Sequence, residues 1–318
     1  MRKVLPVLAF CLFGQPAAAQ TYPAKPVNIV VSVPAGGTLD AIARMVARDL
    51  SESLGQQFVV ENRPGANGNI AADYVRRSSA DGHTLLMLAS STLTLGPYVM
   101  ESVPFNPVKD FAPVATLAGL NMVLLANPSV GVTDLNGLIS HMKAKPNALN
   151  YSSTGNGSFP HVAGALLNRE TKTEATHVPY KGLAPSIQDL LAGQVQYTFD
   201  SGSAVHVKAG KLNALAVIGP KRSTALPEVP TFRELGLPEL EKISGWHGLF
   251  APAGTPEAVI KTLNAEVNKA LKKPDAIERI ESMGFESVTT TPEALGEALR
   301  NDYANYGTLI KKTGITIQ

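Results

Sequence analysis

Cysteine is nearly absent from this sequence of 318 residues, and charged residues are few: there is one Cys, at position 11, and Asp, Glu, Lys and Arg make up 17%. A single Cys cannot form a disulfide within the chain, and Cys11 lies in a leader over residues 1–19 that we expect to be cleaved. The processed chain would then have no thiolate to act as nucleophile or metal ligand. The charged fraction is below the roughly 25% of an average domain, and the composition excludes collagen-like and disordered classes. A globular chain is therefore expected, and its length favours two domains.

Long apolar runs are also missing. Residues 1–19 have the three parts of a secretory signal peptide, namely two basic residues, an apolar run over 4–13 and three alanines that end at Ala19. The apolar run is well short of the roughly 20 residues that cross a bilayer. We therefore expect cleavage after Ala19 and export; an uncleaved anchor and a lipid on Cys11 are the less favoured alternatives. Export without disulfides is typical of a bacterial periplasmic protein.

The sequence carries 28 basic and 26 acidic residues, and two of the basic residues belong to the predicted leader. The processed chain then has 26 residues of each sign and no net formal charge. A neutral chain has no global basic field, so we expect no nucleic-acid partner, and anion binding would depend on local groups.

Motifs that would point to catalysis are absent from the sequence. There is no Gly-x-Ser-x-Gly elbow, phosphate loop or His-Glu-x-x-His motif, and the six histidines lack metal-ligand spacing. The turn over 155–157 lacks the third glycine and the later acid of a dinucleotide site. We therefore predict no catalytic residue, metal or cofactor, and a secreted α/β enzyme is kept only as an alternative.

Short runs rich in β-branched residues alternate with segments of helical period, which predicts an α/β fold of parallel sheets covered by helices on both faces. After a Pro-rich stretch at 226–230, residues 256–312 are mostly of helical pattern. The expected strands are 27–33, 58–60, 84–88, 122–125, 176–178, 197–199 and 212–218, and the expected helices before the C-terminal region are 40–54, 135–142, 161–167 and 186–191.

Four turns rich in glycine or hydroxyl residues follow strands, at 33–40, 89–92, 151–158 and 178–182. In open α/β sheets ligands bind at the carboxyl ends of strands, and a helix that starts there presents its positive end. Any one of these turns could merely reverse the chain, but four in the same position favour a binding site. The first three contain no Lys or Arg, which suits a carboxylate held by neutral donors and then released.

Two acidic residues near these turns have open roles. Asp40 is either a first-turn acid favoured by the helix dipole or a residue that orders the ligand loop. Asp200, at the end of a strand, could accept N–H groups across a cleft or repel ligands of the wrong charge. Arg63 is expected to be a structural clamp.

Ordered motifs along nearly the whole processed chain resemble the Bug family of periplasmic solute-binding proteins, the receptors of tripartite tricarboxylate transporters. The motifs that carry the resemblance lie at 22–40, 60–70, 80–86, 106–111, 151–158, 177–182 and 248–256.

The resemblance implies a type II periplasmic-binding-protein fold with a ligand between two lobes and a membrane permease as partner. It places lobe 1 at 20–122 plus 246–318 and lobe 2 at 123–245, in a protein expected to be a monomer. A ligand sensor for a signalling kinase is the alternative role. The ligand-binding residues predicted by the resemblance and by the turns are Ala35, Gly36, Gly37, Thr38, Asp40, Ser90, Ser91, Ser153, Thr154, Gly155, Asn156, Phe159, His161, Tyr180, Asp200 and Trp246.

Three departures from the usual family pattern bear on specificity. Phe159-Pro160 precedes His161, the stretch 199–206 is short, and Leu93 stands where a histidine is common. These changes make the site more apolar, so we predict a bulky carboxylate, an aromatic dicarboxylate such as terephthalate being one candidate. Phe159 as an ordinary core residue is the alternative to Phe159 as a stacking wall.

Overall fold

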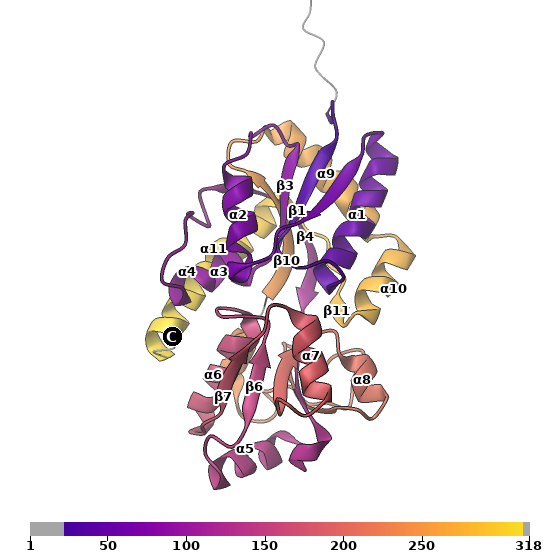
Figure 1. The fold of residues 1–318 in the computed structure, drawn as a ribbon. Helices are drawn as coiled ribbons and strands as arrows, with labels where there is room; N and C mark the ends of the chain where they lie inside the picture. Colours follow the sequence, from indigo (N-terminus) through magenta and orange to yellow (C-terminus); the bar gives the residue numbers. More distant parts are fainter. Residues whose placement is uncertain (1–21, 244, 314–318) are drawn as a thin grey trace, which may run out of the picture.

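Two β-sheets divide the chain in the computed structural model, which describes residues 22–243 and 245–313 (Figure 1). The predicted leader at 1–19 lies outside these residues. The sheet of lobe 1 has the order β11 (Phe285–Glu286), β4 (Phe111–Leu120), β10 (Gly245–Pro252), β3 (Thr84–Ala89), β1 (Val27–Val31) and β2 (Phe58–Asn62). The sheet of lobe 2 has the order β7 (Thr176–Pro179), β6 (Asn150–Ser153), β8 (Tyr197–Asp200), β5 (Met122–Ala126) and β9 (Asn213–Ile218).

Helices cover both faces of each sheet, which confirms the α/β class. Lobe 1 carries α1 (Thr38–Leu54), η1 (Ala66–Gly68), α2 (Asn69–Arg76), α3 (Ser91–Thr94), α4 (Gly96–Val99), α9 (Glu257–Leu271), α10 (Pro274–Ser282) and α11 (Pro292–Thr313). Lobe 2 carries η2 (Pro128–Val130), α5 (Leu135–Ala144), α6 (Phe159–Thr171), α7 (Leu183–Leu191), α8 (Ala204–Lys208) and η3 (Pro238–Lys242). No helix among the described residues is long and apolar enough to cross a membrane.

The prediction of parallel sheets is right for part of each sheet and wrong for the rest, because both sheets are mixed. Strands β1, β2 and β3 are parallel, as are β6, β7 and β8, but β10 is antiparallel to β3 and β4, and β5 is antiparallel to β8 and β9. The reason is the path of the chain between lobes. β5 and β10 follow the crossings, so they start at the edge between the lobes and run against the strands that end there.

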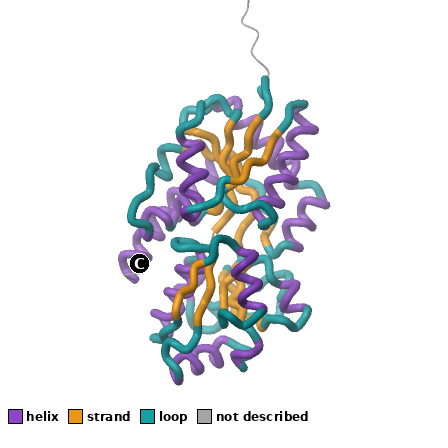
Figure 2. Tube along the Cα trace, in the orientation of Figure 1, coloured by secondary structure: helices purple, strands orange, loops and turns teal. Residues whose placement is uncertain are grey.

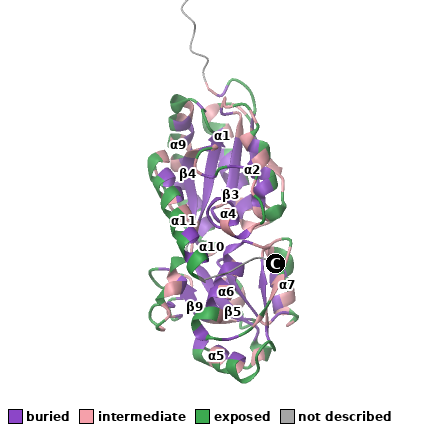
Figure 3. Ribbon diagram, turned by 90° about the vertical axis from the view of Figure 1, so that its left-hand side faces the viewer, coloured by how far each residue is buried: buried purple, intermediate pink, exposed green. Residues whose placement is uncertain are grey.

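Alternate side chains of β1 enter different cores of lobe 1. Val27, Ile29 and Val31 pack with α1, α9 and α10, whereas Val30 packs with α2 and α11 on the opposite face. Successive side chains of a strand point to opposite faces, and four of the five residues of β1 are buried valine or isoleucine, with Asn28 the polar exception. Figure 3 shows the same layering, with buried strands inside and exposed surfaces on the outer helices.

The C-terminal helix α11 contributes to the cores of both lobes. Its Leu295 and Leu299 are buried in lobe 1, and its Tyr306 and Leu309 are buried with side chains of lobe 2. The chain passes from the sheet of lobe 1 to that of lobe 2 between β4 and β5, and it returns between β9 and β10. The lobe boundaries at 122 and 245 stay a prediction, and α11 packs on both sides of them.

Candidate ligand-binding site between the lobes

The turns singled out in the sequence lie between the two sheets. Strands β1 and β3 of lobe 1 run toward lobe 2, and β6, β7 and β8 of lobe 2 run toward lobe 1, as their pairing with the crossing strands requires. Figure 2 shows the loops that follow them as teal segments between the orange sheets. Each sheet therefore presents the carboxyl ends of its parallel strands to the other lobe.

Asp40 fixes the turn between β1 and α1. Its Oδ2 accepts hydrogen bonds from the Gly36 N–H and from Arg44 Nε, both at 3.0 Å. Its Oδ1 accepts from Arg44 Nη2 at 3.0 Å and from Asn62 Nδ2 at 2.8 Å. The loop-ordering role left open by the sequence is thus present in the structure.

The negative charge of Asp40 is paired with the guanidinium of Arg44. Burial alone would raise the pKa of this carboxyl, but hydrogen bonds led by the one from Arg44 outweigh burial and hold the pKa below its usual value. The two-pronged contact with Arg44 is the strong geometry for a guanidinium and a carboxylate. A buried Asp40 can therefore order the turn without presenting an unpaired negative charge to an anionic ligand.

Backbone donors remain at the start of α1. The first intrahelical bond there runs from the Ala41 N–H to the Gly37 carbonyl oxygen, and the Gly36 N–H is taken by Asp40. The N–H groups of Gly37 and Thr38 have no partner among the described residues. Such orphan donors and the helix dipole favour an anion at this point.

The serine turn after β3 is anchored to the strand that enters lobe 1 from lobe 2. Ser90 is fully buried, its N–H donates to the Trp246 carbonyl at 2.8 Å, and its Oγ accepts from the Trp246 N–H at 3.0 Å. The indole Nε1 of Trp246 donates to Asp302 Oδ2 of α11 at 2.9 Å. Ser90 and Trp246 thus hold β3, β10 and α11 together, and Ser91 beside them is also buried.

In lobe 2, the turn between β6 and α6 is closed by its own hydrogen bonds. Ser153 Oγ accepts from the Gly155 N–H at 3.1 Å, and the Ser158 hydroxyl donates to the Gly155 carbonyl at 2.7 Å. The side chains of Thr154 and Asn156 are partly exposed and form no hydrogen bond with the described residues. They are the polar groups of this turn that are left for a ligand.

Two histidines lie beneath this turn. His161 Nδ1 accepts a hydrogen bond from the Gly157 N–H at 3.2 Å, and His177 Nε2 lies 2.6 Å from Ser153 Oγ. Burial lowers the pKa of His161 to about 4, and burial together with His161 lowers the pKa of His177 to about 3. Both rings are neutral at pH 7.

Tyr180 and Asp200 are each engaged within lobe 2. The Tyr180 hydroxyl donates to Asp189 Oδ2 at 2.6 Å. Burial, and to a smaller extent the hydrogen bond to Asp189, raises the pKa of Tyr180 to about 12. Asp200 Oδ2 accepts from the Gly202 N–H at 3.0 Å and from the Ser203 hydroxyl at 2.6 Å. Burial raises the pKa of Asp200 despite these bonds. Asp200 therefore closes the turn after β8.

Turns of the two lobes touch each other. Asn67 Nδ2 of lobe 1 donates to the Gly157 carbonyl oxygen of lobe 2 at 3.1 Å. A β-carbon on Gly182 would lie 3.7 Å from Pro34 Cγ, and one on Gly202 would lie 3.9 Å from Thr38 Oγ1. The structure therefore brings the β1–α1 turn, which holds Ala35 to Thr38, against the turns that follow β7 and β8.

Sequence reasoning missed Asn67 and Arg44. Asn67 lies after β2, outside the four turns, and has a positive φ of 51°. The Thr92 hydroxyl donates to its carbonyl oxygen at 2.7 Å, which ties the loop to the turn after β3. The local signal for Asn67 was the Gly-Ala-Asn-Gly run, since Asn tolerates the left-handed region.

Phe159 lies in a hydrophobic core. Its side chain is 2% exposed, and its ring centroid is 5.9 Å from that of Tyr306 in α11. A β-carbon on Gly245 would overlap the same ring. These contacts support the packing alternative for Phe159, and Leu93 is likewise fully buried in a core of lobe 1.

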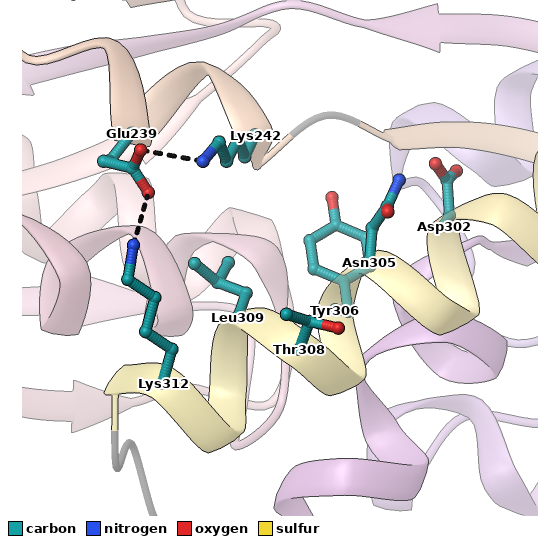
Figure 4. A pocket seen from close by; sticks show the side chains of 8 residues that line it. All are labelled: Glu239, Lys242, Asp302, Asn305, Tyr306, Thr308, Leu309 and Lys312. Carbon is teal, nitrogen blue, oxygen red and sulfur yellow. Dashed lines mark hydrogen bonds and ion pairs between the residues drawn. The ribbon is translucent and has the colours of Figure 1, made fainter.

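A separate cavity of about 410 Å³ lies between η3 and α11 (Figure 4). Lys242 Nζ donates to Glu239 Oε1 at 2.7 Å, and Lys312 Nζ lies 4.0 Å from Glu239 Oε2. Asp302, the partner of Trp246, also lines the cavity. The predicted ligand-binding residues are not part of its wall.

Two lobes that present strand ends and neutral donors to each other define a solute-binding protein of the periplasmic-binding class. The family model described as "Tripartite tricarboxylate transporter family receptor" matches residues 42–315, and the chain belongs to this family. The family consists of periplasmic solute-binding receptors and not of enzymes, which confirms the prediction of a non-catalytic protein.

Similar proteins cover nearly the whole chain. Protein BugT of Bordetella pertussis is 36% identical over 306 residues, which are 95% of this chain and 94% of BugT. The structure of R. palustris Rpa4515 with adipate has a TM-score of 0.87 at 34% identity and covers 93% of this chain and 100% of its own. MatC from Rhodopseudomonas palustris with bound malate has a TM-score of 0.85 at 33% identity, covering 91% and 100%.

Proposed function

We propose that this receptor closes its lobes on a small organic dicarboxylate and delivers it to the membrane permease of a tripartite tricarboxylate transporter. The observation that carries the proposal is the meeting of donor-rich turns from both lobes, linked by the bond from Asn67 to Gly157. Two structural relatives are described with adipate and with malate, which are both dicarboxylates.

Local groups support the choice of an anion. The start of α1 offers the N–H groups of Gly37 and Thr38, and the β6–α6 turn offers the side chains of Thr154 and Asn156. The nearby carboxylate of Asp40 is already paired with Arg44. Neutral donors hold a carboxylate more weakly than a buried arginine would, which suits a ligand that must be passed on.

An aromatic dicarboxylate such as terephthalate is the narrower version of the proposal. Its support from the sequence came from Phe159 and Leu93, and both side chains are buried in cores. A repacking of Phe159 would be needed for it to stack on the ligand. The class of dicarboxylates is therefore proposed ahead of any single member.

A thermal-shift screen of the processed protein tests the ligand class. Adipate, malate and terephthalate are compared with their neutral diamides, so that size is kept while charge is removed. A ligand at 100 times its dissociation constant stabilises the folded state by roughly 2.7 kcal/mol. At least one dicarboxylate should raise the melting temperature while its diamide does not. Stabilisation by a sugar or a cation, with no response to any carboxylate, would overturn the proposal.

Delivery to a permease needs its own test. The ligand-loaded receptor should co-purify with transporter subunits from membranes of its own host, and the ligand-free receptor should do so less. Co-purification with a sensor kinase instead would favour the sensing alternative.

A further inference from the structure

The imidazole rings of His161 and His177 stack on each other under the β6–α6 turn. Their centroids are 3.9 Å apart and their planes are inclined by 13°. His161 comes from the first turn of α6, and His177 comes from β7. The stack therefore joins two elements whose ends carry predicted ligand-binding residues.

Each ring holds one part of the turn that lies above it. Because the Gly157 N–H points at His161 Nδ1, at a distance of 3.2 Å, this nitrogen must be the unprotonated acceptor and the ring proton must be on Nε2. His177 Nε2 lies 2.6 Å from Ser153 Oγ, which in turn accepts from the Gly155 N–H. The two rings thus bind the turn at its start and at its end.

The hydrogen bond from the Gly157 N–H to His161 Nδ1 needs a neutral His161 ring. A protonated His161 would carry a hydrogen on Nδ1 and face the Gly157 N–H donor, and two cationic rings at this spacing would repel each other. Burial keeps both rings neutral, with the pKa of His161 lowered to about 4 and that of His177 to about 3. Tyr151, which pairs with His177 across β6 and β7, packs against the stack with its ring centroid 5.1 Å from that of His177.

Gly157 connects this stack to the other lobe. Its φ of 77° lies in the left-handed region, and its N–H points to His161 while its carbonyl oxygen accepts from Asn67 Nδ2. The two groups belong to peptide planes that meet at the Gly157 Cα, so holding the N–H fixes one plane and leaves only φ and ψ of Gly157 to set the direction of the carbonyl. An acceptor at His161 Nδ1 therefore helps to place the group that Asn67 reaches when the lobes meet.

We propose that His161 and His177 are positioning residues, a neutral imidazole clamp that holds the 153–157 turn in its ligand-binding conformation and presents the Gly157 carbonyl to Asn67. This inference rests on the proposed function, since it assigns a role in carboxylate binding at the same site. It assigns His161 an action through Nδ1 and Gly157, not a direct contact between Nε2 and the ligand.

Three replacements of His161 separate the possible roles. Asparagine places its side-chain oxygen where Nδ1 stands, glutamine reaches the position of Nε2 instead, and alanine offers neither. His161→Asn should bind the best dicarboxylate of the screen within about threefold of wild type. His161→Gln and His161→Ala should bind about tenfold more weakly, the scale expected for one or two lost hydrogen bonds. His141→Asn, on α5, is the control for loss of a histidine.

The outcomes are distinct. Rescue by glutamine and not by asparagine would show a direct ligand contact and overturn the clamp. Equal affinities of His161→Ala and wild type would also overturn it, whatever the melting temperatures. If the wild-type protein binds no carboxylate at all, the proposed function fails. The clamp is then tested in the ligand-free protein, by the tautomer of His161.

Nitrogen-15 NMR of the ligand-free protein at pH 7 supplies that independent readout. An unprotonated Nδ1 on His161, with amide shifts of Gly155 and Gly157 that move in His161→Ala and recover in His161→Asn, supports the clamp. A proton on Nδ1 of His161 contradicts it.

Discussion

Asn67 Nδ2 donates a hydrogen bond of 3.1 Å to the carbonyl oxygen of Gly157, and the two residues belong to different lobes. The bond is partly buried, unlike the exposed ion pair between Lys221 and Glu286 that also joins the lobes at 3.1 Å. An exposed ion pair contributes little because water and salt screen it. We therefore expect substitution of Asn67 to affect closure of the lobes more than substitution of Lys221 or Glu286.

Replacing Asn67 by glycine removes the amide while keeping a residue that tolerates its φ of 51°. We expect the affinity for the dicarboxylate to fall about fivefold, the value of one hydrogen bond, mainly through faster dissociation. The matched control is Asn147→Gly, because Asn147 has a φ of 60° and bonds to Glu174 away from the facing turns. Calorimetric titration should show the loss only for Asn67; an equal loss in both variants would contradict a specific contact.

Asp40→Ala should weaken both the fold and binding. The substitution removes the acceptor of the Gly36 N–H and leaves Arg44 only its bond to Asn62 Oδ1, at a cost of about 1–3 kcal/mol in the free energy of unfolding. Asp73→Ala is the control, since Asp73 also pairs with two arginines, Arg76 and Arg77, but on α2. Denaturant unfolding should show a smaller loss for Asp73, and ligand affinity should fall for Asp40 alone. Unchanged affinity in Asp40→Ala would show that the order of this turn does not matter for binding.

Phe159 offers a sharp choice between core and ligand wall. Its burial against Tyr306 predicts that Phe159→Ala lowers the free energy of unfolding by about 3–5 kcal/mol, whereas Phe159→Leu lowers it less. Both variants should keep the wild-type preference between adipate and terephthalate. A stable Phe159→Ala protein that loses terephthalate binding and keeps adipate binding would instead establish Phe159 as the stacking wall.

Much of the fold could be predicted because its signals are local. Strand β1 consists of valine and isoleucine apart from Asn28, and the Gly-rich turn and amphipathic helix that follow it are contiguous in the chain. Strands β4 and β10 were not predicted: β4 contains Pro113 and many small residues, and β10 contains two glycines. Their pairing with each other depends on segments more than a hundred residues apart.

In the candidate site, too, local features could be predicted from the sequence and contacts between distant segments could not. The turns could be located from glycine and serine after strand-like runs, but the partner of Asn67 could not, because it depends on how the lobes meet. The burial of Phe159 depends on Tyr306 in a helix near the far end of the chain. The role of Asp40 needed Arg44 one helical turn later, at a spacing that a helix brings together.

Stability should fall in mild acid because of buried neutral histidines. His247 is 6% exposed, packs on Phe285, and has a pKa lowered by burial to about 4. Between about pH 6.5 and pH 4, His247 is protonated in the unfolded chain and neutral in the folded protein. The stability present above pH 6.5 is therefore lost as the pH falls. His247 alone accounts for about 3 kcal/mol of this loss.

His247→Leu should therefore reduce the dependence of the unfolding free energy on pH between pH 6.5 and pH 4 by the share of His247, while the shares of His161 and His177 remain. His141→Leu, at a partly exposed position on α5, is the control. Urea unfolding at several pH values measures both. The same acid loss in His247→Leu and in wild type would show that His247 titrates normally in the folded protein.

The position of a bound dicarboxylate in a crystal structure tests the central claim most directly. We predict its carboxylate oxygens within hydrogen-bonding distance of the Gly37 and Thr38 N–H groups on one side and of Thr154 or Asn156 on the other, with Asn67 bonded to Gly157. A dicarboxylate found instead in the cavity between η3 and α11, or on the outer surface of either lobe, would contradict the account.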